Sequence, residues 1–331
     1  MVRETAGKGR RIAAALAVAA LCAPGTFLRT EVPTSFPTDI ALSQVAGPSE
    51  TGTPGWRVEG VWRYSTGPTR MFGGYSALFA IGPDRLRAFS DRGTRFTFTP
   101  PDRLRSGEGG DYRDVSRQLV DPRFANDLWD IESATRDPAT GNYWLGFEGT
   151  HAIHRYSIAS DFEDVRLLQG EVDWYVNSGA EAMVRLADGR FVVLAEGEEE
   201  GRSEGLIYSG DPVVGDTPTR FEVQLPVSDF AITDAAQLPD GRVLLLLRSL
   251  AWDLPPFASM IAIADTPKGN ETWEPAIALD LSGVLPPENY EGLAIFEESD
   301  GTLSIWVISD DDLSVNQRTL VARLTFDPTA E

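Results

Sequence analysis

One pattern recurs five times along this 331-residue chain and constrains its fold more than any other feature. Each copy has a polar residue before a short apolar strand, then a tight turn, then a second apolar strand that ends in a polar or charged residue. The third copy shows every part: residues 177–183, a turn at Asp188-Gly189, a strand over 191–195, and Glu196. Apolar runs on both sides of a turn predict paired strands and not helices. We therefore expect an all-β protein.

The spacing of the copies predicts the architecture. The residues near the start of the first strand of each copy, Ser76, Glu132, Glu181, Asp229 and Glu291, lie 56, 49, 48 and 62 residues apart. Such spacing is typical of four-stranded propeller blades with loop insertions, and the chain has room for about six of them. We predict a single β-propeller with six blades of four antiparallel strands. Residues 56–64 are expected to pair with residues 320–326, which closes the ring and removes free sheet edges.

The turns have a recognisable chemistry. Three copies turn at an Asp-Gly pair, at Asp188, Asp240 and Asp300. A two-residue hairpin loop needs positive φ at both central residues, and Asp-Gly tolerates this conformation. The sequence therefore predicts two-residue hairpins at these points.

The N-terminus is typical of a targeting segment. Four basic residues precede an apolar stretch that is too short to span a bilayer, which predicts a secretory signal peptide over residues 1–25. A flexible lead-in is expected over 26–55 and the propeller domain over 56–331. Arg10-Arg11 leaves twin-arginine export open, and Cys22 leaves a lipid anchor open. The protein is thus expected to be exported, either periplasmic or secreted.

Composition excludes several classes of partner. The chain has 29 basic and 50 acidic residues, a net charge of −21, which disfavours nucleic acid because phosphate backbones require Lys and Arg. It equally disfavours anionic membrane surfaces. With two histidines and one cysteine, a zinc site of His and Cys ligands is not expected. Nothing indicates an oligomer or membrane insertion beyond a possible N-terminal anchor, so we predict a monomer that acts on a small molecule.

Acidic residues occupy equivalent places in the repeat, and this predicts a local cluster. One set lies where the first strands begin, the innermost strands of a propeller. This set comprises Glu132, Glu181, Asp229 and Glu291. A second set lies where the second strands end. This set comprises Asp91, Glu148, Glu196 and Asp310. Both sets should gather at one mouth of the central channel.

Such a cluster requires electrostatic compensation. Two carboxylates ~4 Å apart repel by about 4 kcal/mol at an effective dielectric constant near 20. Raised pKa values, arginine partners or a bound cation would relieve the repulsion. Arg92 and Arg248 lie in the same register and are candidate partners. Oxygen ligands without His or Cys suit Ca²⁺, which takes 6–8 of them.

Five motifs in this order resemble the bacterial "esterase-like activity of phytase" family, over roughly residues 56–327. They are residues 72–78 with 90–93, Glu148-Gly149 with the strand through 153–156, 177–183, 289–294 and 309–311. The resemblance implies an exported propeller, and the family's name suggests hydrolysis of esters or phosphoesters. The Asp-Ala-x-Asp-Asp-Pro signature of other β-propeller phytases is absent, so phytate itself is not predicted as the substrate.

The acidic set and the resemblance together lead to a hypothesis. We expect a phytase-like, esterase-like hydrolase of phosphate or carboxylic esters with a carboxylate-bound Ca²⁺ at the propeller channel. The predicted metal ligands are Asp91, Glu132, Glu181, Glu291 and Asp310. The predicted general base is Glu148 or Glu196. The predicted substrate-binding residues are Arg92, Arg248, Asn177 and Asn289. A sugar-lactone hydrolase and a non-catalytic propeller that binds a ligand or a protein are the alternatives, because fold does not decide function.

Overall fold

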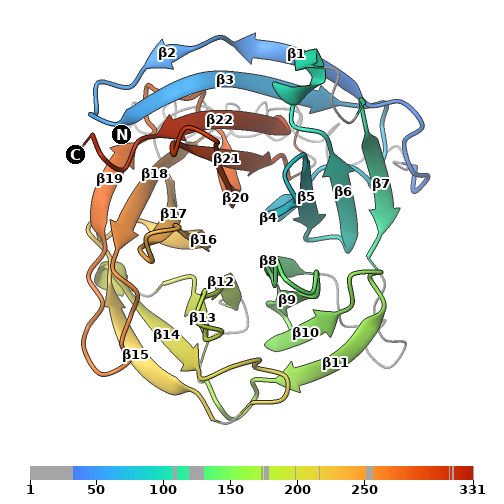
Figure 1. Ribbon diagram of the computed structural model, residues 1–331. Helices are drawn as coiled ribbons and strands as arrows, with labels where there is room; N and C mark the ends of the chain where they lie inside the picture. Colours follow the sequence, from blue (N-terminus) through green and yellow to red (C-terminus); the bar gives the residue numbers. More distant parts are fainter. Residues whose placement is uncertain are drawn as a thin grey trace, which may run out of the picture.

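The computed structural model describes residues 33–106, 110–118, 130–172, 174, 179–197, 199–215, 217–250, 256–312, 314 and 317–330. Within these residues, five antiparallel sheets stand around a central axis like the blades of a propeller (Figure 1). The prediction of an all-β single β-propeller is confirmed, but the prediction of six blades was wrong. The predicted signal peptide lies outside the described residues.

The blades follow one another along the chain, and the strands of blades 1 to 4 run from the channel outward in the order of the sequence. Blade 1 has β4 (Tyr75–Ile81), β5 (Arg85–Ser90), β6 (Thr94–Phe98) and β7 (Arg113–Arg117). Blade 2 has β8 (Ile131–Arg136), β9 (Tyr143–Phe147), β10 (Ala152–Tyr156) and β11 (Phe162–Leu167). Blade 3 has β12 (Ala180–Arg185), β13 (Phe191–Ala195), β14 (Arg202–Tyr208) and β15 (Thr219–Gln224). Blade 4 has β16 (Ala231–Gln237), β17 (Val243–Leu250), β18 (Phe257–Ala264) and β19 (Ala276–Asp280).

Blade 5 joins the two ends of the described chain. Its strands are β20 (Asn289–Glu297), β21 (Leu303–Asp310), β22 (Leu320–Phe326), β3 (Trp56–Ser65) and β1 (Ala41–Ala46), with β2 (Ser49–Glu50) also paired to β3. The predicted closure is present, because Arg63 pairs with Leu320 and Trp56 pairs with Phe326. The rings of Trp56 and Phe326 stack with centroids 4.3 Å apart. These early strands complete the fifth blade instead of forming a sixth, which is why a count based on length was too high.

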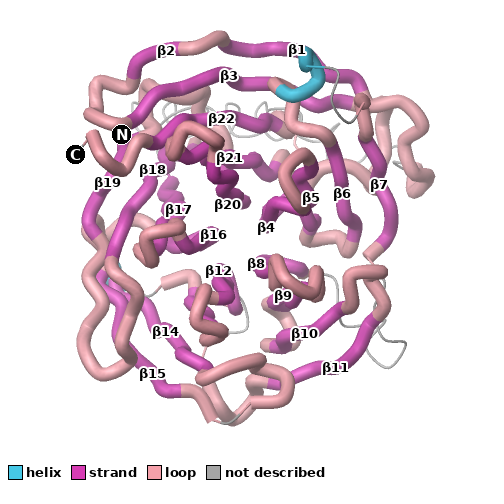
Figure 2. Tube along the Cα trace, viewed as in Figure 1, coloured by secondary structure: helices cyan, strands magenta, loops and turns pink. Residues whose placement is uncertain are grey.

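Helices contribute little to the described chain. The two 3-10 turns are η1 (Arg103–Ser106) and η3 (Glu199–Gly201), and strands joined by loops make up the rest (Figure 2). In the described part of the chain, no helix has the length and apolar character needed to cross a membrane.

The Asp-Gly turns differ from the prediction. In the turn at Asp188, the N–H of Leu186 donates to the carbonyl of Arg190 (2.8 Å), so three residues lie in the loop. Gly189 has a φ of +91°, whereas Asp188 does not have a positive φ. The Asp188 side chain instead accepts the N–H of Arg190 (3.0 Å). Asp-Gly therefore serves a three-residue loop with a glycine in the left-handed conformation, and the prediction of two-residue hairpins was wrong.

The hydrophobic core is divided among the seams between blades. Five clusters of buried side chains each join two neighbouring blades, and together they run around the ring. In the seam between blades 1 and 2, Phe79 and Phe89 pack against Tyr143 with ring centroids 5.8 and 5.7 Å apart. In the seam between blades 5 and 1, Tyr64 contacts Phe96 and Phe98. Burial of these aromatic rings holds each blade to the next.

A buried carboxylate connects three blades near the axis. Asp234, on the innermost strand of blade 4, has no exposed surface. Its oxygens accept the N–H of Ala235 (2.8 Å) and the N–H of Leu293 on blade 5 (2.6 Å). The N–H of Leu78 on blade 1 also donates to it. Innermost strands leave one backbone edge without a strand partner, and Asp234 supplies the acceptor for that edge on two neighbouring blades.

Candidate functional site

Each innermost strand carries a β-bulge at its start, and the bulged residues form the first ring of the site. The bulged residues are Ser76, Glu132, Glu181, Thr233 and Glu291. A bulge adds one residue to a strand and re-aims its side chain, which is common next to functional sites. The prediction that Asp229 belongs to this set was wrong, because Asp229 is exposed before β16 begins and Thr233 takes the equivalent place.

A second ring lies beside the first. Its members lie at the end of the second strand of each blade, one residue after the partner of the residue that precedes the bulge. Its members are Asp91, Glu148, Glu196, Arg248 and Asp310. Both rings therefore lie at the same end of the channel, as predicted from the repeat. We call these ten residues the carboxylate end.

Blade 4 differs from the others because it contributes Thr233 and Arg248 where they contribute mostly acids. The Arg248 guanidinium forms ion pairs from Nη1 with Glu291 Oε1 (3.1 Å) and from Nη2 with Glu196 Oε1 (3.4 Å). Nη1 also contacts Asn289 Oδ1 (3.1 Å), and the Asn289 amide donates to Glu291 Oε1 (2.8 Å). Arg248 thus neutralises one side of the site, and Asn289 orients Glu291.

The other side of the site holds three acids without such compensation. Oxygens of Asp130, Glu132 and Glu148 all lie within 4.8 Å of one another. Among the described residues, no Arg or Lys forms an ion pair with any of the three. Asp130 was not among the predicted site residues. It directly precedes β8 with a φ of +109°, and the blades before and after it carry Gly74 and Gly179 at the equivalent place.

Burial and repulsion between like charges raise the pKa values of Glu132, Glu181 and Glu148. Burial raises the pKa of Glu132 well above its ordinary range, and the charges of Glu181 and Glu291 add to the effect. Burial likewise raises the pKa of Glu181, and the charges of Glu196 and Glu148 add to the effect. Burial and the neighbouring Asp130 raise the pKa of Glu148 to about 7.

Glu291, Asp91 and Asp310 of the carboxylate end follow the same rule. Burial raises the pKa of Glu291 to about 7 although Arg248 and the Asn289 amide oppose the rise. Burial also raises the pKa of Asp91, against the opposing charge of Arg92. Burial and the charge of Glu291 raise the pKa of Asp310. All seven acids of the two rings, with Asp130, form one connected set of like charges.

The other predicted residues have distinct surroundings. Arg92 Nε lies 3.6 Å from Asp91 Oδ1, and its Nη1 atom is buried without a hydrogen-bond partner in the described chain. Asp311 joins blade 5 to the start of blade 1, because it accepts the Gly74 N–H (3.1 Å) and the Thr319 hydroxyl (2.9 Å). Asn177 lies outside the described residues.

A glycine positions Asp91. Gly74 has a φ of +69°, and a Cβ atom there would lie 2.3 Å from Asp91 Oδ1 and 2.5 Å from Arg92 Nη1. We expect Gly74→Ala to lower the free energy of unfolding by more than the about 1–2 kcal/mol that the left-handed conformation costs a residue with a Cβ. Gly82→Ala is the matched control, since Gly82 has a φ of +61° and open space around it. Equal losses of unfolding free energy for the two variants, measured in urea, would show that a methyl group at position 74 does not crowd Asp91.

The raised pKa values predict how stability depends on pH without a divalent cation. Folded Glu148 and Glu291 titrate at about 7, against an ordinary value of 4.5. Between these values the folded state binds more protons than the unfolded state, so stability falls as pH rises. We expect the Tm in chelator to decrease from pH 5 to pH 7.5, and Glu148→Gln to flatten the decrease. A Tm that is constant or rises over this interval would contradict the prediction.

The channel is hollow at its opposite end. A cavity of about 450 Å³ is lined by the innermost strands of all five blades. Leu78, Ala134, Val184, Ala235 and Leu293 are members of its mainly apolar wall. The carboxylate end and this far mouth are thus chemically different.

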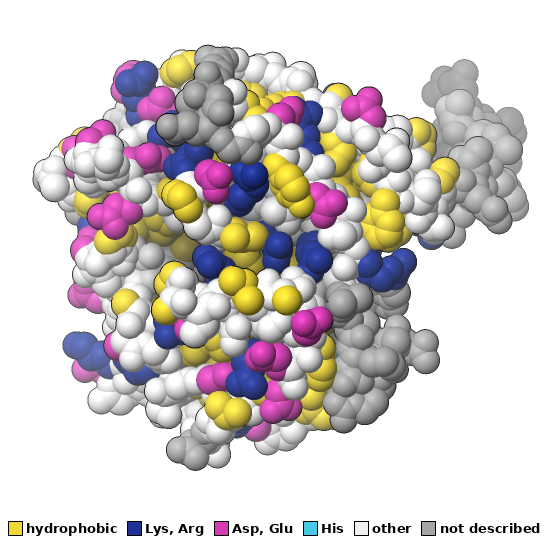
Figure 3. Space-filling model, turned by 45° about the vertical axis from the view of Figure 1, so that its right-hand side comes forward, with side chains coloured by type: hydrophobic (Ala, Val, Ile, Leu, Met, Phe, Trp, Pro, Cys, Tyr) yellow, Lys and Arg dark blue, Asp and Glu magenta, His cyan; other side chains and the backbone are white. Residues whose placement is uncertain are grey.

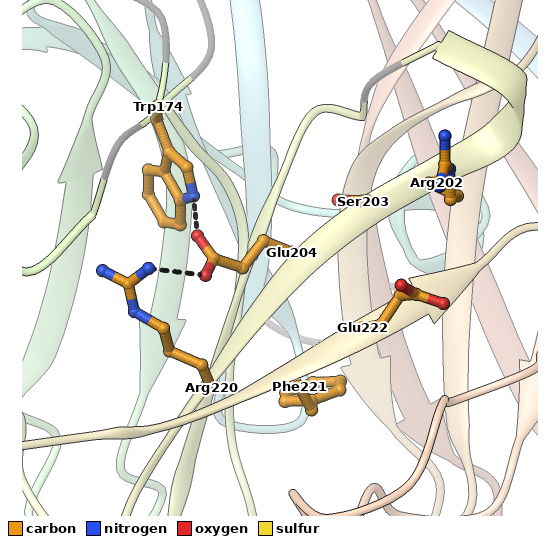
Figure 4. A pocket seen from close by; sticks show the side chains of 7 residues that line it. All are labelled: Trp174, Arg202, Ser203, Glu204, Arg220, Phe221 and Glu222. Atoms are coloured by element: carbon orange, nitrogen blue, oxygen red, sulfur yellow. Dashed lines mark hydrogen bonds and ion pairs between the residues drawn. The ribbon is translucent and has the colours of Figure 1, made fainter.

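A further pocket of about 540 Å³ lies against the two outer strands of blade 3 (Figure 4). The Trp174 indole donates to Glu204 (2.7 Å), and Arg220 forms an ion pair with the same carboxylate (3.1 Å). Figure 4 shows both side chains converging on Glu204. The Glu204 carboxylate therefore has both a hydrogen-bond donor and an opposite charge within the wall of the pocket.

Comparison with known proteins gives a family and several likenesses of fold. No curated protein matches the sequence. Among solved structures, an endo-arabinase from Bacteroides thetaiotaomicron VPI-5482 is 12% identical, with 77% of this chain and 94% of the other covered and a TM-score of 0.47. A thermostable family-43 glycoside hydrolase is 12% identical (78% and 91% covered, TM-score 0.45). Hydrazine synthase from Kuenenia stuttgartiensis is 12% identical (90% and 88% covered, TM-score 0.39).

A family model gives the stronger result. The model is described as phytase-like, with the esterase-like activity of phytase, and it matches residues 70–313. This range contains four complete blades, the first two strands of blade 5 and the whole carboxylate end. Because the match covers well over half of the chain, this protein belongs to the phytase-like family.

Proposed function

We propose that this protein is an exported hydrolase of phosphate or carboxylic esters that works at the carboxylate end with a bound Ca²⁺. The observation that carries the proposal is the group formed by Asp130, Glu132 and Glu148, whose oxygens lie within 4.8 Å of one another without a basic partner in the described chain. Membership of the phytase-like family supports ester chemistry. Export to the periplasm or beyond, a monomeric state and a small-molecule substrate are parts of the same proposal.

The chemistry of the donor set fits Ca²⁺. The acids of the two rings offer only oxygen ligands, which Ca²⁺ prefers. Burial and like charges raise the pKa values of Glu132 and Glu181, so these groups resist ionisation unless positive charge is nearby. A divalent cation would supply this charge and release protons on binding.

The chain's own residues would share the work. Asp130 and Glu132 would hold the ion, with Glu181, Glu291, Asp91 and Asp310 as the further carboxylates of the same end. A bound Ca²⁺ would polarise an ester oxygen and favour deprotonation of water. Glu148 has a pKa of about 7 and suits proton transfer near neutral pH; Glu196 is the second candidate for this role.

Substrate oxygens need hydrogen-bond donors. The Arg92 Nη1 atom is buried without a hydrogen-bond partner in the described chain and is the better candidate. Arg248 already contacts Glu196, Glu291 and Asn289, so it would contribute mainly charge. An arginine fork suits phosphate and carboxylate oxygens alike.

The test is turnover of a phosphate monoester, a carboxylic ester and a sugar lactone by the purified mature protein, with Ca²⁺ and with chelator. We expect turnover of an ester that requires Ca²⁺. Lactone opening alone would favour a lactonase. Absence of turnover on all three substrates, with protein shown to be folded, would contradict the proposal and favour a binding propeller.

A further inference from the structure

Blade 1 carries arginines where the other blades carry core side chains. Arg87 on β5 pairs with the third residue after the bulge of blade 1. In each other blade, one residue on the second strand pairs with the third residue after the bulge. These residues are Trp144, Val192, Leu244 and Trp306, and all are buried. They fill the seam toward the following blade. Arg87 therefore points into the seam between blades 1 and 2 from a position that is apolar elsewhere in the ring.

The third strand of blade 1 repeats the exception. Arg95 on β6 pairs with Phe89, and the equivalent residues of the other blades are again small or apolar. They are Ile153, Gly205, Ile261 and Val321. Arg87 pairs with Thr97, which lies two residues after Arg95 on β6. The side chains of Arg87 and Arg95 therefore lie on the same face of the sheet. Their guanidiniums therefore project into the same seam.

A third arginine reaches this seam from the other side. Arg136, at the end of β8 on blade 2, donates from Nη1 to the carbonyl of Ala80 on blade 1 (3.1 Å). Burial, together with the charges of Arg95 and Arg136, lowers the pKa of Arg87. The seam thus holds three neighbouring positive charges in a protein of net charge −21. Figure 3 brings this side of the ring forward and shows Lys and Arg side chains in a row across it.

In the described chain, hydroxyls and not carboxylates are the side-chain hydrogen-bond partners of Arg87 and Arg95. Elsewhere in the ring arginines pair with carboxylates, as Arg155 does with Asp211 (2.6 Å). Within the described residues, Arg87, Arg95 and Arg136 form no ion pair. Arg87 instead donates to the Thr97 hydroxyl (3.0 Å), and Arg95 donates from Nε to the Ser116 hydroxyl (3.0 Å).

One donor is left over. The Nη1 atom of Arg95 is buried and has no hydrogen-bond partner in the described chain. A buried donor without a partner is costly, and an apolar side chain at the same place would not carry this cost. Three guanidiniums with hydroxyls beside them are the groups that recognise an oxyanion.

We propose that the seam between blades 1 and 2 binds a doubly charged tetrahedral oxyanion, either inorganic phosphate or the phosphoryl group of a small molecule, between Arg87, Arg95 and Arg136. A dianion matches three positive charges better than a monovalent carboxylate does. The hydroxyls of Thr97, Ser116 and Ser160 lie beside the same arginines and are available to its oxygens. This site is separate from the carboxylate end and does not depend on the proposed hydrolase activity.

The test is calorimetric titration of the protein in chelator, at constant ionic strength, with inorganic phosphate, glycerol phosphate and acetate. We expect phosphate or glycerol phosphate to bind, and the tighter of the two identifies the free ion or the phosphoryl group as the preferred form. The double variant Arg87→Gln with Arg95→Gln should weaken binding at least tenfold for each charge removed. The control Arg190→Gln with Arg220→Gln removes two charges on blade 3 and should bind like the unmodified protein.

Additional controls separate a loss of phosphate binding from a loss of folding. Circular dichroism and a thermal melt show whether the double variant is folded; if it is not, Arg136→Gln alone is measured, because its described hydrogen bond is to one backbone carbonyl. Glu181→Gln should leave phosphate binding unchanged, which separates this site from the carboxylate end. No binding of either phosphate, equal binding by the double variant, or equal affinity for acetate would overturn the proposal.

Discussion

Replacement of Asp234 by alanine is expected to lower the free energy of unfolding by about 3–5 kcal/mol, because three buried backbone donors would lose their acceptor and each such loss costs about 1–3 kcal/mol. The side chain is fully buried and accepts the backbone N–H groups of Ala235, Leu293 and Leu78. Alanine would leave these donors without an acceptor in the middle of the ring. Urea unfolding would measure the loss, which corresponds to a fall in Tm of roughly 10 °C.

Two further variants define the cause. Asp234→Asn keeps one acceptor oxygen but places an amide N–H₂ group among backbone donors, so an intermediate loss is expected. Asp229→Ala removes an exposed acid five residues away and should change stability by no more than about 0.5 kcal/mol. A loss for Asp234→Ala no larger than that for Asp229→Ala would show that the ring does not depend on this carboxylate.

Glu181→Gln is expected to have opposite effects on the cation-free and the Ca²⁺-loaded protein. Burial and the charges of Glu196 and Glu148 raise the pKa of Glu181, so the neutral glutamine should stabilise the fold in chelator at pH 7.5. The same change removes a proposed ligand. Ca²⁺ affinity and Ca²⁺-dependent turnover should each fall about 100-fold, a loss of about 2.7 kcal/mol in binding free energy.

The control for this variant is Glu222→Gln, which removes one exposed acid on the outer strand of blade 3. It should change neither Ca²⁺ affinity nor turnover. Thermal melts with chelator and with Ca²⁺, beside the turnover assay, give both readouts from one preparation. If Glu181→Gln leaves Ca²⁺ affinity and turnover intact, Glu181 is not part of the working site.

The repeat in the sequence was sufficient to predict strands, a propeller and one acidic mouth. Glu132, Glu181 and Glu291 were placed correctly because each stands at the same bulge of its blade. The repeat failed at blade 4, where Thr233 takes that place and no acid marks it. The repeat points to Asp229 instead, the acid that precedes the strand in the sequence, although the strand begins only at Ala231.

Residues that occur once in the ring are the ones that a repeat cannot reveal. Asp130 was missed because the blades before and after it have Gly74 and Gly179 at the equivalent place. The number of blades was overestimated for a related reason. The number of residues allows six blades only if every segment forms its own blade. In the structure, β3 and β1 instead extend the blade that the C-terminal strands begin.

The closure of the ring by β3 and β22 constrains the order in which the chain can fold. Blades 1 to 4 each consist of consecutive strands and can form as soon as their own residues leave the ribosome. Blade 5 stays incomplete until residue 326 is available, because Val58 and Val61 of β3 pair with residues that are synthesised after blades 1 to 4. Such long-range pairing is slow to form, and the open ring exposes apolar seams meanwhile. Ring closure is therefore the step at which the newly made chain is most vulnerable to aggregation.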